Sequence, residues 1–360
     1  MGKPTNVQRG RTTWEAISRW EREGVIIPLQ RALAPIEVLS QLLGHSVGGE
    51  AILPLFASLY WCIDQHKCIA GIWLVPLSEI ANGIVKWLTA RPRPAWVDGR
   101  VRLLAWSSEF SFPSSHSQLA FAVAHFMVVA SDHPEAVTHT PALPAYLYAS
   151  AVALSRIHVG VHYPSDVAVG SAWGLATAAA YDRILPTLLQ LLGRDPAVAG
   201  LFAALSTPGL IAAVGLIVGY RAVRKSRCSP EADRTAVAAA KEETEQWRRR
   251  ICQGRYANRG LDPVEDPLGL YMGMLGVCTG LAFGTALKRY VPLSYPTSTR
   301  NALLRGVLGN AGLLTMFVGI AECTPKKPFA LYQTLRFLRY ALVPTYILLL
   351  APPIFERAGI

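Results

Sequence analysis

Several apolar runs in this sequence approach the length of roughly 20 residues that a helix needs to cross a bilayer. They belong to a chain of 360 residues that is 51% hydrophobic and only 16% charged, with a mean hydropathy of +0.28. Inside a bilayer every backbone polar group needs a partner within the protein, and a helix supplies one along a single segment. The sequence therefore predicts an all-α fold, a polytopic transmembrane helical bundle with roughly 8–10 spans.

The same runs predict how the chain is divided. A polar N-terminal segment and an interfacial helix are expected over residues 1–46, because the moderately apolar part of this region still carries charged residues. A core of closely spaced spans follows over 47–187. The C-terminal transmembrane helices occupy 188–360, with a hydrophilic extramembrane loop at 221–264. The expected spans are 50–64, 68–88, 115–131, 142–159, 164–181, 198–220, 268–287, 302–321 and 335–352.

Composition argues against several other classes of protein. The formal net charge of +11 is assigned to the loops of a membrane protein. No basic stretch alternates with aromatic residues, so no nucleic-acid partner is expected. The six cysteines are scattered and form no Cys-x-x-Cys, which argues against zinc knuckles and a disulfide framework. The polar N-terminus lacks the short apolar core of a cleaved signal peptide.

Three polar clusters lie at the ends of apolar runs. The first, Lys86–Pro94, ends the second expected span, and the second, Phe112–Ser117, begins the third. The third cluster, Ser155–Asp166, joins the fourth and fifth spans. If the crossings are counted along the chain, all three clusters emerge on the same side of the membrane. We therefore expect them to form one shared site near one membrane face.

The cations of these clusters are suited to holding a phosphate group. Arginine donates two parallel hydrogen bonds from a planar fork, and lysine adds a point charge. The residues interpreted as a phosphate clamp are Lys86, Arg93 and Arg156. The residues interpreted instead as juxtamembrane side chains for lipid headgroups are Arg91, Arg100 and Arg102.

The second cluster has the features of a helix start. Ser114 or Ser115 can cap the third span, and the spacing of Ser115 and Gln118 fits a capping box. The exposed N–H groups and the dipole of such a helix start attract an anion. His116 lies in this first turn and is a candidate general acid for a leaving oxygen.

The third cluster holds the candidate nucleophile. His162 is followed by Pro164, which suits a first helical turn, and Asp166 lies four residues after His162. A carboxylate at that position can accept a proton from one ring nitrogen and leave the other free to attack phosphorus. His158 has no carboxylate at the same spacing and is interpreted as structural.

No metal or other cofactor is expected from this set of residues. A two-metal phosphatase needs several clustered aspartates. Asp166 is the sole carboxylate within the three clusters as defined above.

Glycines repeat every fourth residue in the run 268–287, at Gly276, Gly280 and Gly284. Small residues at this spacing let helices approach closely in lipid. Packing within the chain is the favoured interpretation, and a homo-oligomer formed through this span is the alternative.

The ordered set of motifs resembles the type 2 phosphatidic acid phosphatase (PAP2) superfamily. The patterns are Lys-x6-Arg-Pro, Pro-Ser-x-His and Ser-Arg-x5-His-x3-Asp. They begin here at Lys86, Pro113 and Ser155. Ser115 stands where the superfamily usually has glycine. This feature, and the runs Ser108–His116 and Ser155–His162, look like the sphingosine-1-phosphate phosphatase branch. The resemblance covers most of the chain except about 1–40 and 221–264.

This resemblance implies a PAP2-type catalytic core, metal-independent dephosphorylation and a phosphohistidine at His162. It also implies that Asp166 orients His162 and that His116 protonates the leaving alkoxide. The residues implied to bind phosphate are Lys86, Arg93, Ser114, Ser115 and Arg156. The branch implies a long-chain sphingoid base 1-phosphate as substrate, such as sphingosine 1-phosphate or dihydrosphingosine 1-phosphate. It also implies the endoplasmic reticulum membrane as the location.

Other functions are carried as alternatives. Within the same fold, the substrate is phosphatidate, a polyprenyl diphosphate or glucose 6-phosphate, since glucose 6-phosphatases share several of these features. Vanadate-dependent halide oxidation uses a similar clamp, but it does not suit a polytopic membrane chain. A non-catalytic lipid-binding or lipid-transport protein is the alternative of another class. The branch implies an active site facing the lumen, whereas the arginine-rich loop at 221–264 favours the cytoplasm for the same side.

Overall fold

The structure, a computed structural model, describes residues 14–129, 140–194, 242–257, 267–291, 293–325 and 328–360. These residues form helices, turns and loops, with no strand among them. The first elements are η1 (Glu21–Ile26), α2 (Ile27–Ala32), η2 (Ala34–Ile36), α3 (Glu37–Ser46), α4 (Gly49–Cys62), α5 (Gln65–Ile72), α6 (Leu74–Thr89), α7 (Pro94–Val97), α8 (Ser115–Val129), α9 (Ala142–His158) and α10 (Pro164–Arg194). The later elements are η4 (Gly254–Tyr256), α13 (Pro267–Leu287), η5 (Lys288–Tyr290), α14 (Thr299–Cys323), α15 (Phe329–Thr345), η6 (Tyr346–Leu350) and α16 (Ala351–Arg357).

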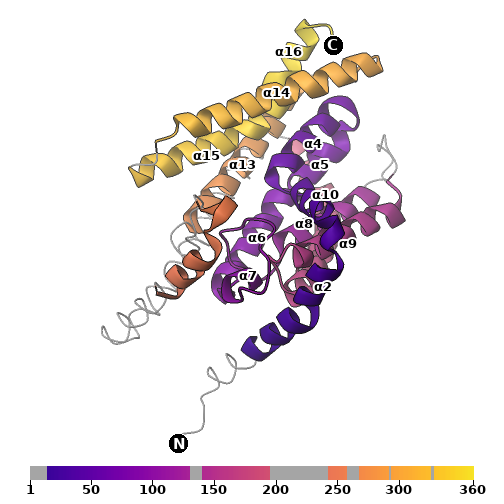
Figure 1. The fold of residues 1–360 in the computed structure, drawn as a ribbon. Helices are drawn as coiled ribbons and strands as arrows, with labels where there is room; N and C mark the ends of the chain where they lie inside the picture. The colour runs from indigo at the N-terminus through magenta and orange to yellow at the C-terminus, as the bar shows by residue number, and fades with distance from the viewer. Residues whose placement is uncertain (1–13, 130–139, 195–241, 258–266, 292, 326–327) are drawn as a thin grey trace, which may run out of the picture.

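The helices α6, α8, α9 and α10 form the bundle that carries the polar clusters (Figure 1). Glycines bring α10 onto the backbone of α8. A Cβ added to Gly170 or Gly174 would come within 3.0 Å of the carbonyl oxygens of Ser114 and Gln118. Such close approach is typical of small residues between membrane helices. It fixes the start of α8 beside the start of α10.

A large apolar core joins this bundle to the C-terminal helices. Trp61 of α4, Trp73 and Phe126 pack with Leu281 of α13 and Ile347 of η6, and all five are buried. In Figure 1 the helices α14 and α15 lie side by side at one end of the molecule, and α13 lies along α15. The second half of the chain therefore supports the bundle that carries the clusters.

The glycine stripe of α13 faces α15 of the same chain. A Cβ added to any of these three glycines would come within 3.0 Å of α15 or of η6, which continues it. The atoms met by Gly276, Gly280 and Gly284 are, in that order, the Phe337 oxygen, the Ala341 oxygen and the Leu348 side chain. The favoured expectation of internal packing is therefore confirmed. An oligomer through this face is not shown.

The second expected span is the main departure among the described helices. The sequence predicted one helix over 68–88, but the chain forms α5 and α6 with a break at Trp73. Pro76 lies in the first turn of α6, where its missing N–H costs nothing. In a continuous helix its ring would clash with the carbonyl of Ile72, four residues earlier. The expected span 198–220 lies outside the described residues.

Two helices among the described residues are long and apolar enough to cross a membrane, Thr299–Cys323 and Leu331–Arg357. A third candidate is the N-terminal pair Trp14–Ala32 and Ala34–Ser46, which is bent by 67°. Its second helix exposes apolar side chains, including Val38 and Leu42. The larger number of spans predicted from the sequence stays a prediction.

Candidate active site

The three predicted clusters meet at one cavity. It has a volume of about 100 Å³ and lies where α6 ends, α8 begins and α9 turns into α10. Its lining is Gly44, His45, Lys86, Arg93, Ala105, Trp106, Ser107, Glu109, Ser115, His116, Arg156 and His162. The structure thus brings together six of the eight predicted site residues in the wall. The other two, Ser114 and Asp166, lie buried behind it.

Lys86 reaches the cavity from the last turn of α6 and is 4% exposed. Its ammonium group donates to the Glu109 carboxylate at 2.6 Å and to the Ser115 hydroxyl at 3.2 Å. The charge of Lys86 is the main cause that lowers the pKa of Glu109. A carboxylate therefore already occupies one side of the predicted phosphate clamp.

Arg93 is held by the loop that precedes α8 and by the turn after α9. It donates to the carbonyl oxygens of Glu109 at 2.6 Å, Val161 at 2.9 Å and Phe110 at 3.3 Å. Burial lowers the pKa of Arg93 to about 10, so the guanidinium remains charged at neutral pH. These bonds leave it little freedom to turn away from His162.

Arg156 enters the cavity from the last turn of α9 through a gap that Gly44 of α3 leaves. A Cβ on Gly44 would come within 3.0 Å of Nη1 of Arg156. Within the described chain, Nε of Arg156 is buried and has no hydrogen-bond partner. The described lining therefore holds three cations and one carboxylate, Glu109. This excess of positive charge favours binding of an anion.

His162 lies in the turn between α9 and α10 and is 1% exposed. Its Nε2 is 3.1 Å from Nη1 of Arg93, and its Nδ1 is 3.6 Å from Oδ2 of Asp166. Because Arg93 can only donate, Nε2 is the acceptor and Nδ1 carries the proton. Burial, and then the charges of Arg93 and Arg156, hold the pKa of His162 well below its usual value. The ring is therefore neutral, and the lone pair of Nε2 accepts from Arg93 at the cavity wall.

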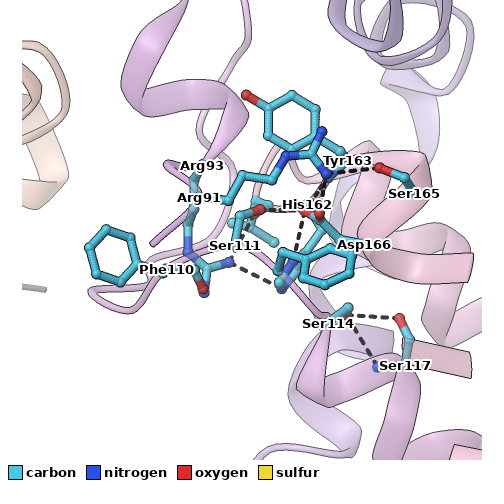
Figure 2. A network of polar contacts seen from close by, with 12 residues as sticks. Arg91, Arg93, Phe110, Ser111, Ser114, Ser117, His162, Tyr163, Ser165 and Asp166 are labelled. Atoms are coloured by element: carbon cyan, nitrogen blue, oxygen red, sulfur yellow. Dashed lines mark hydrogen bonds and ion pairs between the residues drawn. The ribbon is translucent and has the colours of Figure 1, made fainter. Parts of the chain in front are cut away.

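Asp166 lies in the first turn of α10 and is fully buried (Figure 2). One oxygen accepts from Nη1 of Arg91 at 2.5 Å, and the other accepts from the Ser111 hydroxyl and from the N–H of Tyr163 at 2.9 Å. The contact with Tyr163 caps the helix that begins at Pro164, as predicted for that proline. The carboxylate is thus fixed behind the His162 ring.

The start of α8 differs in one detail from the prediction. The Ser114 hydroxyl accepts from the N–H of Ser117 at 3.3 Å, so Ser114 is the cap. The expected capping box of Ser115 and Gln118 is wrong, because the Gln118 side chain contacts α6, accepting from the Asn82 amide at 2.6 Å. Ser115 and His116 are left free to line the cavity.

The interpretation of Arg91 as a headgroup-facing side chain is wrong. Arg91 is 8% exposed and contacts Asp166 and Ser165 (Figure 2). It also contacts Glu21 of the N-terminal helix, Trp14–Ala32. Arg100 and Arg102 lie at the surface, with side chains 60% and 54% exposed, and pair with Asp98 and Glu37. Their contact with lipid headgroups stays a prediction. His158 is structural as expected, since its Nδ1 contacts the Ser40 hydroxyl at 2.7 Å.

Sequence reasoning missed several residues of the cavity wall. Gly44 and His45 come from α3, in the region assigned to an interfacial helix, and no local pattern marks them. Trp106 and Glu109 come from the loop between the first two clusters. The one signal for Glu109 was its place five residues before the predicted cap Ser114.

A part of the hydrophilic loop at 221–264 packs beside this wall. Trp247 and Ile251, on the helix formed by residues 242–251, bury against Trp96 and Phe110. Arg250 donates to the carbonyl of Trp96. The described part of this loop is therefore attached to the segment that carries Arg93 and Glu109.

The sequence is similar to those of known proteins. The sequence model of the PAP2 superfamily matches residues 69–189, and that of a PAP2 superfamily phosphatase transmembrane extension matches residues 272–360. Decaprenylphosphoryl-5-phosphoribose phosphatase of Mycobacterium tuberculosis is 39% identical over 152 residues, 42% of this chain and 80% of that protein. The protein of that name from Mycolicibacterium smegmatis is 32% identical over 155 residues, 41% of this chain and 80% of that protein.

A more distant relative comes from the branch suggested by the sequence. Mouse sphingosine-1-phosphate phosphatase 2 is 24% identical over 175 residues, 43% of this chain and 47% of that protein. No solved structure matches the chain. The two matched regions together span both the bundle with the cavity and the C-terminal helices. The chain is therefore an integral membrane phosphatase, a phosphoric monoester hydrolase, and belongs to the PAP2 superfamily.

Proposed function

We propose that this phosphatase removes the phosphate from a monoester carried by a membrane lipid, through a phosphohistidine at His162 and without a metal ion. The observation that carries the proposal is the placement of the His162 ring. Its Nε2 lies 3.1 Å from Arg93 at a cavity lined by three cations, while its Nδ1 faces the Asp166 carboxylate at 3.6 Å. Nε2 becomes the attacking atom when Arg93 donates to the bound phosphate in place of Nε2, and Nδ1 is turned toward a base.

The reaction proceeds in two steps. In the first step, Nε2 of His162 attacks phosphorus and the ester P–O bond breaks. His116, protonated once the phosphate anion offsets the cations around it, gives its proton to the leaving alkoxide. In the second step, water attacks the same phosphorus, His116 takes a proton from that water, and the P–N bond breaks to release inorganic phosphate. His162 is neutral before the first step because its pKa is depressed. Asp166 stabilises the charge that the ring carries in the intermediate.

The cations of the wall stabilise charge on the phosphoryl oxygens. Lys86, Arg93 and Arg156 face the phosphate in a site where little water competes with them. Such preorganised charge is the main means by which a protein accelerates phosphoryl transfer. The acceleration needed for phosphate monoesters approaches about 10²¹-fold, so loss of any one cation is expected to be severe.

The substrate class follows from two groups of relatives. The mycobacterial relatives are named for a phosphorylated ribose joined to a decaprenylphosphoryl group, and the mouse relative is named for sphingosine 1-phosphate. Both are phosphate monoesters with a long apolar chain. We propose this shared chemistry and give priority to the prenyl-linked sugar phosphate, because the identity and the share of the relative that is matched are higher there. A location in the endoplasmic reticulum goes with the sphingoid substrate, since mycobacteria have no such organelle.

The test is phosphate release by purified protein in detergent with excess EDTA. The esters are decaprenylphosphoryl-5-phosphoribose, sphingosine 1-phosphate, phosphatidate and glucose 6-phosphate, assayed side by side. His162→Ala is compared with wild type, and His125→Ala is the matched control. His125 contacts Tyr146 and Asp182 and does not line the cavity.

We expect release from a lipid ester that EDTA does not affect, that His125→Ala retains and that His162→Ala loses by at least about 10⁴-fold. An acid-labile phosphoenzyme should form in wild type and should be absent from His162→Ala. Release from glucose 6-phosphate at the same rate would overturn the lipid assignment. Activity that survives His162→Ala, or that EDTA abolishes, would overturn the mechanism. Lipid binding without any release would favour the non-catalytic alternative.

A further inference from the structure

A chain of buried charges connects the N-terminal helix to Asp166. Glu21 is 2% exposed, and its Oε2 accepts from Nη2 of Arg91 at 2.7 Å. Nη1 of the same guanidinium donates to Oδ1 of Asp166 at 2.5 Å. A single arginine thus bridges two buried carboxylates, one from the N-terminal helix and one beside the candidate nucleophile.

Glu21 also holds the start of the helix that carries Asp166. Its second oxygen accepts from the N–H of Ser165 at 2.7 Å, in the first turn of α10. The first N–H groups of a helix have no partner within the helix, and a carboxylate near them is favoured by the helix dipole. One side chain therefore fixes both the arginine and the backbone next to Asp166.

Arg91 has little freedom of its own. Its guanidinium lies over the Tyr163 ring at 3.9 Å and over the Trp14 ring at 4.9 Å, and it donates to the Ser18 hydroxyl at 2.9 Å. Cation–π contacts of this kind gain strength where water is excluded. Trp14 and Ser18 lie on the same N-terminal helix as Glu21, so that helix covers the arginine.

We infer that Glu21 and Arg91 are positioning residues of the hydrolysis, which fix the carboxylate that orients His162. The inference rests on the proposed role of His162 as nucleophile. Arg91 occupies one oxygen of Asp166, so the carboxylate cannot rotate and its other oxygen is the one that faces Nδ1 of His162. The guanidinium of Arg91 also offsets part of the cost of burying the Asp166 charge, and an ionised Asp166 stabilises the ring without removing the proton.

Both residues lie outside the expected machinery. Glu21 precedes residue 69, where the match to the superfamily begins. Arg91 lies within the first cluster, between the two cations assigned to the clamp. The N-terminal helix is therefore part of the active-site assembly, and its loss would leave Arg91 without its buried counter-charge.

A purely structural ion pair is the competing explanation, and kinetics separate the two. If the ion pair only stabilises the fold, its loss should weaken phosphate binding and lower the thermal midpoint. Those effects should be the same whether or not Asp166 is altered. A positioning role should lower kcat, leave inhibition by inorganic phosphate unchanged, and vanish when Asp166 is itself altered. Removing groups that act as a unit gives non-additive losses.

The experiment is a double-mutant cycle in the full-length protein, with whichever of decaprenylphosphoryl-5-phosphoribose and sphingosine 1-phosphate the wild type hydrolyses. The variants are Glu21→Gln, Arg91→Lys and Asp166→Asn, alone and in pairs. Glu23→Gln is the matched control, because Glu23 lies on the same helix but pairs with Arg100 at the surface. The readouts are kcat, the inhibition constant of inorganic phosphate and the thermal midpoint.

We expect Glu21→Gln to lower kcat by about 10–100-fold, by analogy with the loss of a group that orients a metal-binding side chain. Arg91→Lys should lose less, since the charge remains. Neither change should lower kcat further in the Asp166→Asn background, and Glu23→Gln should match wild type. Losses that multiply in that background, or an unchanged kcat in Glu21→Gln and Arg91→Lys, would overturn the inference. If His162→Ala remained active, the proposed mechanism itself would be wrong.

Discussion

Gly44 limits the position of a phosphate-binding cation. The end of the Arg156 side chain occupies the space where a Cβ would lie, and that end is flexible. We therefore expect Gly44→Ala to displace the guanidinium and not the helix. The inhibition constant of inorganic phosphate should rise about 10-fold, the effect of losing one charge-assisted hydrogen bond, while the thermal midpoint changes little. Gly24→Ala, where the nearest atom is 3.5 Å away, is the control. An unchanged constant would mean that Arg156 does not hold the phosphate.

The depressed pKa of His162 sets the acid limit of activity. A protonated ring has no lone pair for attack, so activity falls as the pH drops through the pKa of His162. That fall should come below pH of about 6.5, the usual pKa of histidine. Lys86→Gln removes one of the charges that lower this pKa, so the pKa should rise and the acid limb of kcat/KM should move to higher pH. The same ester is used for both enzymes, which cancels the ionisation of the substrate. If the acid limb of kcat/KM stays in place or moves to lower pH in Lys86→Gln, the limb does not report the titration of His162.

The candidate site was predictable where residue type and spacing carry the chemistry. His162 and Asp166 are four residues apart, and Pro164 marks the helix start between them, so local sequence placed all three. Arg91 and Glu109 were not placed, because their roles depend on partners distant in sequence or across the cavity. Arginine beside a membrane span is typical of a headgroup contact, and only the docking of Glu21 reveals the buried alternative.

Helix packing depends on individual glycines in α13. A methyl group on Gly280 would meet the backbone oxygen of Ala341, which cannot move aside as a flexible side chain can. We expect Gly280→Ala to destabilise the protein by roughly 2–3 kcal/mol, at the upper end for an overpacked core. Thermal unfolding in detergent measures this. Gly319→Ala in α14 is the control, since nothing lies within 4 Å, and its midpoint should equal or exceed that of wild type. Equal midpoints for both variants would contradict close packing of α13 on α15.

Elements were predicted well where an apolar run ends at a proline or a cap. The start of α10 at Pro164 and the length of α13 followed from such signals. The break at Trp73 did not, because hydropathy continues across it and Pro76 is the one local signal that marks it. The N-terminal helices were placed near the interface from their mixed composition. Composition alone cannot show that Glu21 and Gly44 are used inside the protein.

The segment 242–257 lies between the two matched regions of the sequence and touches the wall of the cavity. Trp247 is 8% exposed and packs against Trp96, with the two ring centroids 5.4 Å apart. We expect Trp247→Ala to destabilise this region by on the order of 3 kcal/mol and to lower activity, because the loop with Arg93 and Glu109 loses its cover. Arg249→Ala, on the exposed side of the same helix, should change stability by less than about 0.5 kcal/mol. Full activity in Trp247→Ala would show that the segment is dispensable for the site.

The contacts of Glu21 have a consequence for biosynthesis. Its partners Arg91 and Ser165 lie 70 and 144 residues later in the chain. Contacts with such long sequence separation form late, after the ends of a long intervening segment have met. The N-terminal helix leaves the ribosome before these partners, so the Glu21 carboxylate has no counter-charge until Arg91 has been made and no helix start to hold until Ser165 has been made. A nascent chain arrested before residue 165 therefore carries Lys86, Arg93, Arg156 and His162 but lacks Asp166. Such a chain is expected to be inactive toward the lipids around it.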